Sequence, residues 1–262
     1  MPIRKIFFPV TIVITALLSC FCGSKAFARK APDVRKVVKP DLEQIKSETT
    51  NPESSKYYPK LMASFLSNDT ILTDDDFRYL YYGYLFQEDY EPYRHVYNVQ
   101  RFKEIEPLYS KTTHSRHECQ SILQFATETL ADNPFDLRQL NFLVYAYEKL
   151  GKVNLAKIWQ QKLNHLLLTI ASSGTGTDED NAWVIILPAH EYDFLNLSGI
   201  TASGQSFIPP YYDYISVAQK KDTDPKGYYF NIEPMLKEYY RKHPNEMEED
   251  DITPSDEQDY AA

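Results

Sequence analysis

Hydrophobic residues recur at helical spacing through the first two-thirds of the chain. After Thr73, apolar side chains fall three and four residues apart, at Phe77, Leu80, Tyr81, Tyr84 and Leu85. Thr73 and Asp76 stand where an N-cap residue and its N3 acid belong, so the pattern predicts an amphipathic helix that begins after Thr73. A shorter helical stripe precedes it within residues 56–67, and a short helix is expected to open at Asp41.

Three more helices are predicted by their termini. Ser115 and Glu118 form a second capping box. Asn133–Pro134 is expected to end that helix and cap the next one, which ends at Gly151, where a left-handed residue is needed. The longest apolar stripe follows, from Leu155 to Ile170. Because the connection at Gly151 is short, these last two helices are expected to fold back on one another.

This helical pair resembles a tetratricopeptide repeat. Signature positions of that pattern of about 34 residues fall on Leu143, Tyr147, Gly151 and Ala156. Gln160, Leu163 and Leu168 depart from it, and the resemblance covers about one repeat. A divergent helical hairpin is therefore favoured over a repeat array.

Beyond residue 172 the pattern becomes strand-like. A polar linker precedes a continuous apolar run at residues 182–187, which predicts a buried strand. Residues 211–218 and 227–232 are separated by a loop with turn chemistry and predict a β-hairpin. A last helix is expected from Glu233.

The expected fold class is therefore α+β, with a helical N-terminal two-thirds packed against a small antiparallel sheet. One domain is predicted over residues 56–243, helical over 56–172 and sheet-containing over 182–243. Residues 29–55 are charged and punctuated by proline, so they are interpreted as an extended arm. The segment 244–262 is expected to be a disordered acidic tail, because it holds eight Asp and Glu residues and no Lys or Arg beyond position 245.

Residues 1–28 have the layout of a secretory signal peptide. Two basic residues precede an apolar run, and Ala26–Phe27–Ala28 forms a small-x-small cleavage site. Cleavage after Ala28 and a periplasmic location are favoured. The alternative is a bacterial lipobox at residues 17–20, in which Cys20 would be lipidated and would tether the protein to the outer membrane.

Composition narrows the functional classes. The formal net charge is -9, so nucleic acid is not an expected partner. The chain has 8 glycines, and it contains no phosphate-binding glycine loop, nucleophile elbow or paired CxxC motif. No cofactor is expected. Tyrosine is abundant, with 21 residues, and its amphipathic ring suits half-buried positions.

The order of parts resembles a known family. A leader, the segment YLYYGYLFQ, a helical hairpin, the segment EYDFL and the pair DYISV and GYYFNI follow one another. This arrangement is similar to the exported Bacteroidetes family called domain of unknown function 4919, over most of the mature chain. The resemblance implies export and an α+β layout, but it implies no activity, substrate or site residues.

The segment around residue 190 holds the candidate catalytic chemistry. His190, Glu191 and Asp193 follow the predicted strand closely. In a strand, Glu191 and Asp193 would share one face, and paired carboxylates could serve acid/base or cation chemistry in a hydrolase. The alternative is a solvated strand end. No metal site is expected here, because a zinc helix needs two histidines four residues apart.

A second candidate cluster, His114, His117 and Cys119, straddles a helix start. Cys119 falls on the apolar stripe of that helix and points into the core, whereas His117 points elsewhere. A structural role is therefore favoured over metal binding.

Four tyrosines are the candidate ligand-binding residues. Tyr79 and Tyr82 are expected on flanking faces of the helix after Thr73, and Tyr211 and Tyr212 adjoin a Pro-Pro pair. Exposed tyrosines stack on sugars or line peptide grooves, although they also complete the packing of helices on sheets. We therefore expect a non-catalytic binding or assembly module with a protein or glycan partner in the cell envelope, with a periplasmic hydrolase as the alternative.

Overall fold

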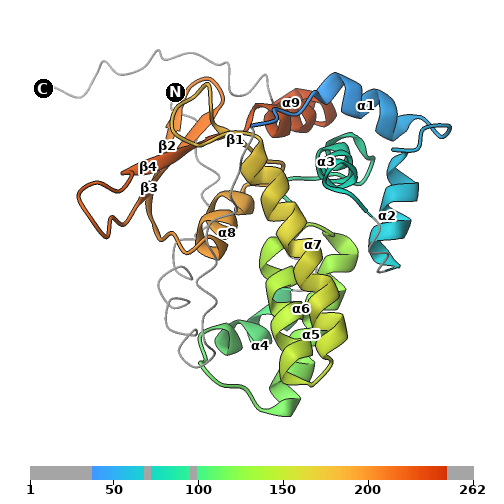
Figure 1. Cartoon of the computed structure of the whole chain (residues 1–262), viewed down its shortest axis with the longest axis vertical. Coiled ribbons are helices and arrows are strands. Elements are labelled where there is room, and N and C mark those ends of the chain that lie inside the picture. Colours follow the sequence, from blue (N-terminus) through green and yellow to red (C-terminus); the bar gives the residue numbers. More distant parts are fainter. Residues whose placement is uncertain (1–36, 68–71, 95–98, 247–262) are drawn as a thin grey trace, which may run out of the picture.

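The computed structural model describes residues 37–67, 72–94 and 99–246 (Figure 1). The predicted leader with Cys20 and the acidic run beyond residue 246 lie outside the described residues. The elements are α1 (Leu42–Thr50), α2 (Tyr58–Leu66), α3 (Asp74–Gly83), the 3-10 turn η3 (Tyr84–Phe86), α4 (Val99–Tyr109), α5 (Arg116–Asp132), α6 (Leu137–Lys149), α7 (Val153–Ser172), β1 (Trp183–Val184), α8 (Ala189–Leu197), β2 (Ala202–Ile208), β3 (Tyr212–Val217), β4 (Gly227–Asn231) and α9 (Glu233–Lys242).

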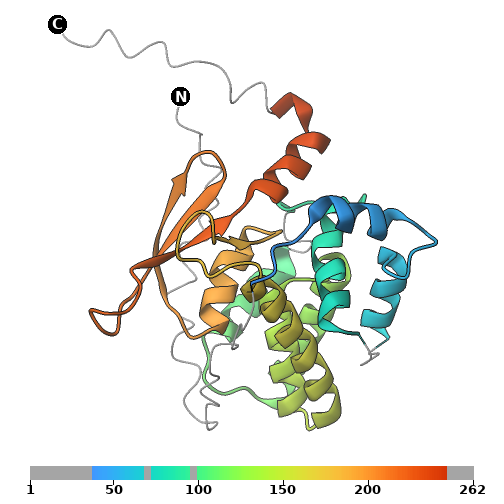
Figure 2. The ribbon, with the colours of Figure 1, turned by 45° about the horizontal axis from the view of Figure 1, so that its top comes forward.

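The predicted α+β class is confirmed. Helices α5, α6 and α7 pack side by side, α3 packs against α7, and the sheet with α8 lies at the other side of the molecule (Figures 1 and 2). One hydrophobic core runs through both halves. It includes Leu80 of α3, Leu166 of α7 and Phe230 of β4, all fully buried.

Local signals placed most helix boundaries correctly. The capping boxes at Thr73 and Ser115 are both formed, and Gly151 adopts φ 77° at the end of α6. The predicted cap of α6 was wrong. Asp136, rather than Asn133–Pro134, accepts from the Gln139 backbone N–H at 2.9 Å, because the chain makes one further turn before the helix begins.

The sheet differs from the expected one in two ways. Its strand order is β1-β4-β3-β2, and β1 pairs with β4 in parallel, so the sheet is mixed rather than antiparallel. Only Trp183 and Val184 of the apolar run form β1, although the whole run is buried. The predicted hairpin at 211–232 is confirmed as β3 and β4. Strand β2 was not predicted, because its exposed sequence ASGQSFI lacks alternating apolar residues.

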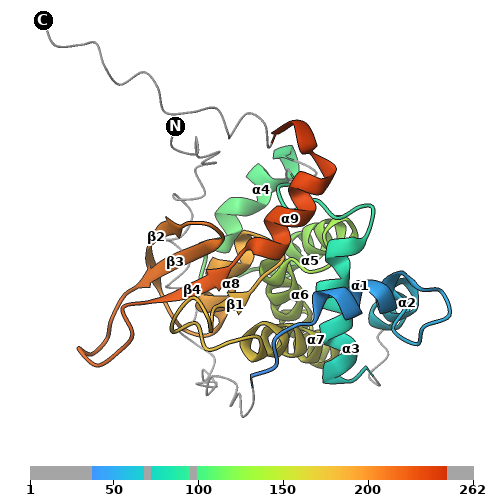
Figure 3. The ribbon, with the colours of Figure 1, turned by 90° about the horizontal axis from the view of Figure 1, so that it is seen from above.

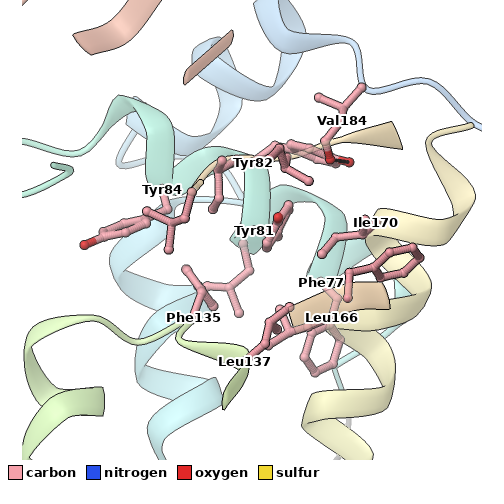
Figure 4. Close-up of a cluster of buried hydrophobic side chains, with 14 of the residues drawn as sticks. Phe77, Tyr81, Tyr82, Tyr84, Phe135, Leu137, Leu166, Ile170 and Val184 are labelled. Atoms are coloured by element: carbon pink, nitrogen blue, oxygen red, sulfur yellow. Dashed lines mark hydrogen bonds between the residues drawn. The ribbon is translucent and has the colours of Figure 1, made fainter. Parts of the chain in front are cut away.

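Tyrosines fill the junction between the helical half and the sheet. Figure 4 shows Tyr81, Tyr82 and Tyr84 from α3 and η3 gathered around Phe135 and Val184. The Tyr82 hydroxyl donates to the Val184 carbonyl at 3.2 Å, and the ring of Tyr84 meets Phe135 edge-on at 5.4 Å. The surplus of tyrosine is therefore partly explained by rings that are buried and hydroxyls that reach buried carbonyls.

Helix α4 was not anticipated from the sequence. It packs on α5 and contributes Ile105 and Tyr109 to a small second cluster with Phe125. Pro107 lies inside the helix, within its last turn.

Helix α1 belongs to the core, which corrects the interpretation of residues 29–55 as an arm. Ile45 and Thr49 are buried, and α1 packs on α3. Gly83, at the end of α3, permits this close approach, since a Cβ there would meet the Thr49 Cγ2 atom at 2.6 Å. The domain therefore begins before residue 56.

Replacing Gly83 by alanine tests this contact. Alanine has the higher helix propensity, yet we expect Gly83→Ala to reduce the free energy of unfolding by about 1–3 kcal/mol, because its methyl group overpacks against Thr49. Denaturant unfolding measures the loss. Adding Thr49→Ser removes the clashing methyl and keeps the hydroxyl that bonds to the Ile45 carbonyl, so it should restore much of the stability. Equal stability of Gly83→Ala and the unsubstituted chain would contradict the packing.

Candidate functional site

The segment around residue 190 is a helix, and this changes where its polar side chains point. Pro188 ends the apolar run and stands at the N-cap position of α8. Successive helical residues are about 100° apart, so His190, Glu191 and Asp193 face different neighbours. They are 1%, 2% and 5% exposed. Both expectations, a shared carboxylate face and a solvated strand end, were wrong.

His190 is held between two buried partners. Its Nε2 atom lies 2.8 Å from the Phe135 carbonyl, and its Nδ1 atom lies 2.7 Å from the Tyr81 hydroxyl. Because a carbonyl only accepts, Nε2 carries the proton and Nδ1 accepts from Tyr81. Burial lowers the pKa of His190 to about 4, so the ring is neutral at pH 7. Both ring nitrogens are therefore occupied by hydrogen bonds within the protein.

Asp193 points to the start of α6 instead of toward Glu191. Its Oδ1 atom accepts from Nε and Nη2 of Arg138, at 3.0 and 2.8 Å. The nearby Asp136 caps α6, and burial together with the charge of Asp193 raises the pKa of Asp136 to about 6. Arg138 thus balances two acids at a buried helix start, which is a structural arrangement.

Glu191 instead meets Asp213, an acid that sequence reasoning did not single out. Asp213 lies on β3 and is 8% exposed, and the two carboxyl groups share a hydrogen bond. Gln205 of β2 joins them, since its Nε2 atom lies 3.4 Å from Glu191 Oε2 and its Oε1 accepts from the Tyr192 hydroxyl at 3.0 Å. The sequence did hold a signal. Alternate residues of a strand share one face, so Asp213 lies on the same face of β3 as the buried Ile215 and Val217 and points inward.

This carboxyl pair retains a proton. Burial and the neighbouring charge of Asp213 raise the pKa of Glu191 well above its usual range, and burial also raises the pKa of Asp213. Two carboxyl groups this close cannot both ionise without strong repulsion. A protonated Glu191 can therefore donate to Asp213. Such pairs perform acid/base chemistry in enzymes where substrate reaches them.

Two of the four candidate tyrosines lie in the interior. Tyr79 is 9% exposed, beside the Lys56 ammonium, and Tyr82 is 1% exposed. The expectation that they lie on exposed faces was wrong, because α3 is covered by α1, α2 and α7. Neither can form part of a surface aromatic patch.

Tyr211 and Tyr212 are half-buried, but only Tyr212 lies in β3, whereas Tyr211 belongs to the turn before it. Tyr211 lies on the side of α9, where the Lys237 ammonium is 6.0 Å from its ring. Tyr212 lies on the face of the sheet that is opposite the buried residues of β3.

Tyr212 shares its face with two more tyrosines. Tyr214 of β3 and Tyr229 of β4 are cross-strand partners, with ring centroids 4.9 Å apart. The register adds small neutral neighbours to this tyrosine face, namely Gly204, Ser206, Ser216 and Gly227. Helix α8 covers the opposite side, and among the described helices none lies over the tyrosine face (Figures 2 and 3).

The histidine and cysteine cluster is dispersed. Cys119 is buried in the core side of α5, as predicted, and His114 lies between the Tyr145 hydroxyl and the Leu108 carbonyl, at 2.6 and 2.8 Å. Within residues 37–67, 72–94 and 99–246, no group of three or more His, Cys, Asp or Glu side chains is placed to hold a metal ion.

These features define a small α+β domain with a mixed four-stranded sheet, an internal carboxyl pair and a tyrosine face. The chain belongs to the family called domain of unknown function (DUF4919), whose model matches residues 43–241. Neither a curated protein nor a solved structure matches the chain. In the part of the chain that the structure describes, no helix is both long and apolar enough to cross a membrane.

The carboxyl pair makes stability depend on pH. An acid whose pKa is raised by folding keeps its proton where the unfolded chain has lost it, so the free energy of unfolding falls as pH rises above about 4.3. We expect the stability of the unsubstituted chain to fall relative to that of Glu191→Gln as pH rises, with a limiting slope of about 1.4 kcal/mol per pH unit for as long as folded Glu191 keeps its proton. Urea unfolding between about pH 4 and pH 7 measures the difference.

A matched control is Glu53→Gln, which alters an exposed glutamate. Its stability should follow that of the unsubstituted chain across the same pH range. A constant difference between Glu191→Gln and the unsubstituted chain would contradict the retained proton.

Proposed function

We propose that this protein is an exported binding module of the cell envelope that recognises a protein or glycan partner through its tyrosine face. One observation carries the proposal. Tyr212, Tyr214 and Tyr229 lie together on a sheet face that no described helix covers, while α8 covers the other face. Tyrosine rings offer an apolar surface and a polar tip at little cost in conformational entropy, which suits recognition.

The composition of the face supports this function. Its other paired positions are Gly204, Ser206, Ile208, Ser216, Gly227 and Asn231, which are neutral and mostly small, and the three rings are half-buried. The face has no Lys, Arg, Asp or Glu on the paired positions of β2, β3 and β4, although 25% of the chain is charged. Neutral surfaces rich in Tyr, Ser, Gly and Asn are typical of binding sites that use stacking and adaptable hydrogen bonds.

A periplasmic hydrolase is the second candidate, and the carboxyl pair is the observation that favours it. The proposed acids would be Glu191 and Asp213, since Asp193 is engaged with Arg138. This candidate is weaker than the first. Both carboxyl groups are less than 10% exposed, and Gln205 occupies bonding positions that a substrate would need.

Export rests on the leader sequence and has a direct test. The intact protein is isolated from the envelope of a host that processes its own signal peptides, and its N-terminus is determined by mass spectrometry. We expect the mature chain to begin at Arg29, following cleavage after Ala28. A lipid-modified Cys20 would replace the free protein by a tethered one, and an uncleaved chain in the cytosol would contradict export.

Removing rings from the tyrosine face tests the binding function. The purified protein is incubated with native envelope extract and, separately, with insoluble envelope polysaccharide, and bound material is measured by co-sedimentation. We expect the double variant Tyr214→Ser/Tyr229→Ser to lose at least about 5-fold in affinity, because each stacked ring contributes about 0.5–1.5 kcal/mol.

The matched control is Tyr57→Ser/Tyr147→Ser, which removes two half-buried rings from the helical half. It should bind as the unsubstituted chain does, and circular dichroism should show that both double variants are folded. Equal binding by both variants would reject the tyrosine face. Turnover of the polysaccharide that is abolished by Asp213→Asn would favour the hydrolase instead.

A further inference from the structure

Strand β2 forms an open edge of the sheet. It is the last strand in the order β1-β4-β3-β2, and Figure 3 shows it outermost. Its five central residues are all exposed. The opposite edge is protected, because β1 has two residues, is buried, and packs against α7. Long edge strands are templates for pairing with another chain.

The edge also lacks most features that prevent such pairing. Natural edge strands are blunted by lysine, proline or an inward charge. The sequence Ala202–Ile208 has no charged residue and no proline, and its single irregularity lies near its start, between Ala202 and Gly204. Phe207 is 40% exposed beside this edge.

The register determines which backbone groups point outward. Val217 N–H donates to the Lys226 carbonyl and the Tyr211 carbonyl accepts from Ile232 N–H, so odd-numbered residues of β3 bond toward β4. Even-numbered residues therefore bond toward β2, and their partners there are Gly204, Ser206 and Ile208. The N–H and C=O groups of Gln205 and Phe207 are left on the free side.

We propose that two copies of this chain pair through β2, antiparallel, about a twofold axis at Ser206. In this register Gln205 of one copy lies opposite Phe207 of the other, and the reverse pair follows from the symmetry. The outward N–H and C=O groups of Gln205 in each copy then bond to the outward C=O and N–H groups of Phe207 in the other copy. Ser206 faces its own counterpart in a pair without hydrogen bonds, where Cα atoms approach to about 4.5 Å.

The observations favour a second copy over an unrelated strand. Gln205 and Phe207 are spaced so that the twofold axis at Ser206 brings each opposite the other residue in the second copy. All of their outward hydrogen-bonding groups then find partners with no shift of register. No like charges meet, although the chain carries a net charge of -9. Phe207 gains a neighbour, and Gly204 lies opposite Ile208 of the other copy, small against large. The pairing also joins the two tyrosine faces into one surface, but it does not rest on the proposed function.

A single cysteine tests the register. The full-length chain, processed by the host and purified, is oxidised with and without Ser206→Cys and analysed on a non-reducing gel. We expect Ser206→Cys to form a disulfide-linked dimer at about twice the chain mass, since the expected Cα separation lies within the disulfide range of about 4.4–6.8 Å. Ser216→Cys lies on the same face but inside the sheet, and it should form no more disulfide-linked dimer than the unsubstituted chain does.

A lysine tests the interface itself. Light scattering of the unsubstituted chain should give a mass that doubles with concentration, and Ser206→Lys should return it to the monomer, because two lysines would face one another at the axis. Circular dichroism checks that the variant is folded. A monomer at every concentration, a dimer unaffected by Ser206→Lys, or a Ser206→Cys disulfide only to a different envelope protein would each overturn the proposal.

Discussion

The joining of helices to sheet depends on tyrosine hydroxyls that bond to a buried stretch of backbone. Residues 182–187 are buried throughout, yet only the first part of this stretch pairs with β4. Tyr82 donates to the Val184 carbonyl, and Tyr90 donates to the Ile186 carbonyl at 2.6 Å. An unpaired buried carbonyl costs about 1–3 kcal/mol. The helical half therefore supplies partners that a neighbouring strand would otherwise supply, and neither half is complete without the other.

Helix α8 applies the same constraint a second time. His190 bonds to α3 and to the loop before α6, Asp193 bonds to Arg138 of α6, and Glu191 bonds to β3. Each of these three side chains thus ties the helix to a different element. These side chains are occupied by hydrogen bonds within the fold. The residues that were the candidates for catalysis in the sequence are therefore the least available to a ligand. The surfaces that remain free are made of less conspicuous residues, on the outer face and open edge of the sheet.

The sequence predicted those features that depend on interactions between residues close together in the chain. The capping boxes at Thr73 and Ser115 and the hairpin of β3 and β4 depend on neighbours in the chain, and all three formed. The pairing of Glu191 with Asp213 joins residues on different elements, and it could not follow from spacing alone. The expectation that strand structure continues beyond residues 182–187 was wrong. Pro188 precedes helix α8 instead, and no periodicity in the sequence revealed the buried acids of this helix.

One strand shows why a tyrosine count says little about function. In Tyr212–Val217 the inward residues are Asp213, Ile215 and Val217, and the outward residues include Tyr212 and Tyr214. The inward acid holds β3 to α8, whereas the outward rings lie beside the edge strand. A shift of register by one residue would bury the rings and expose the acid. The register of β3 therefore determines both features. The pairing that buries Asp213 beside protonated Glu191 also turns Tyr212 and Tyr214 to the opposite face of the sheet.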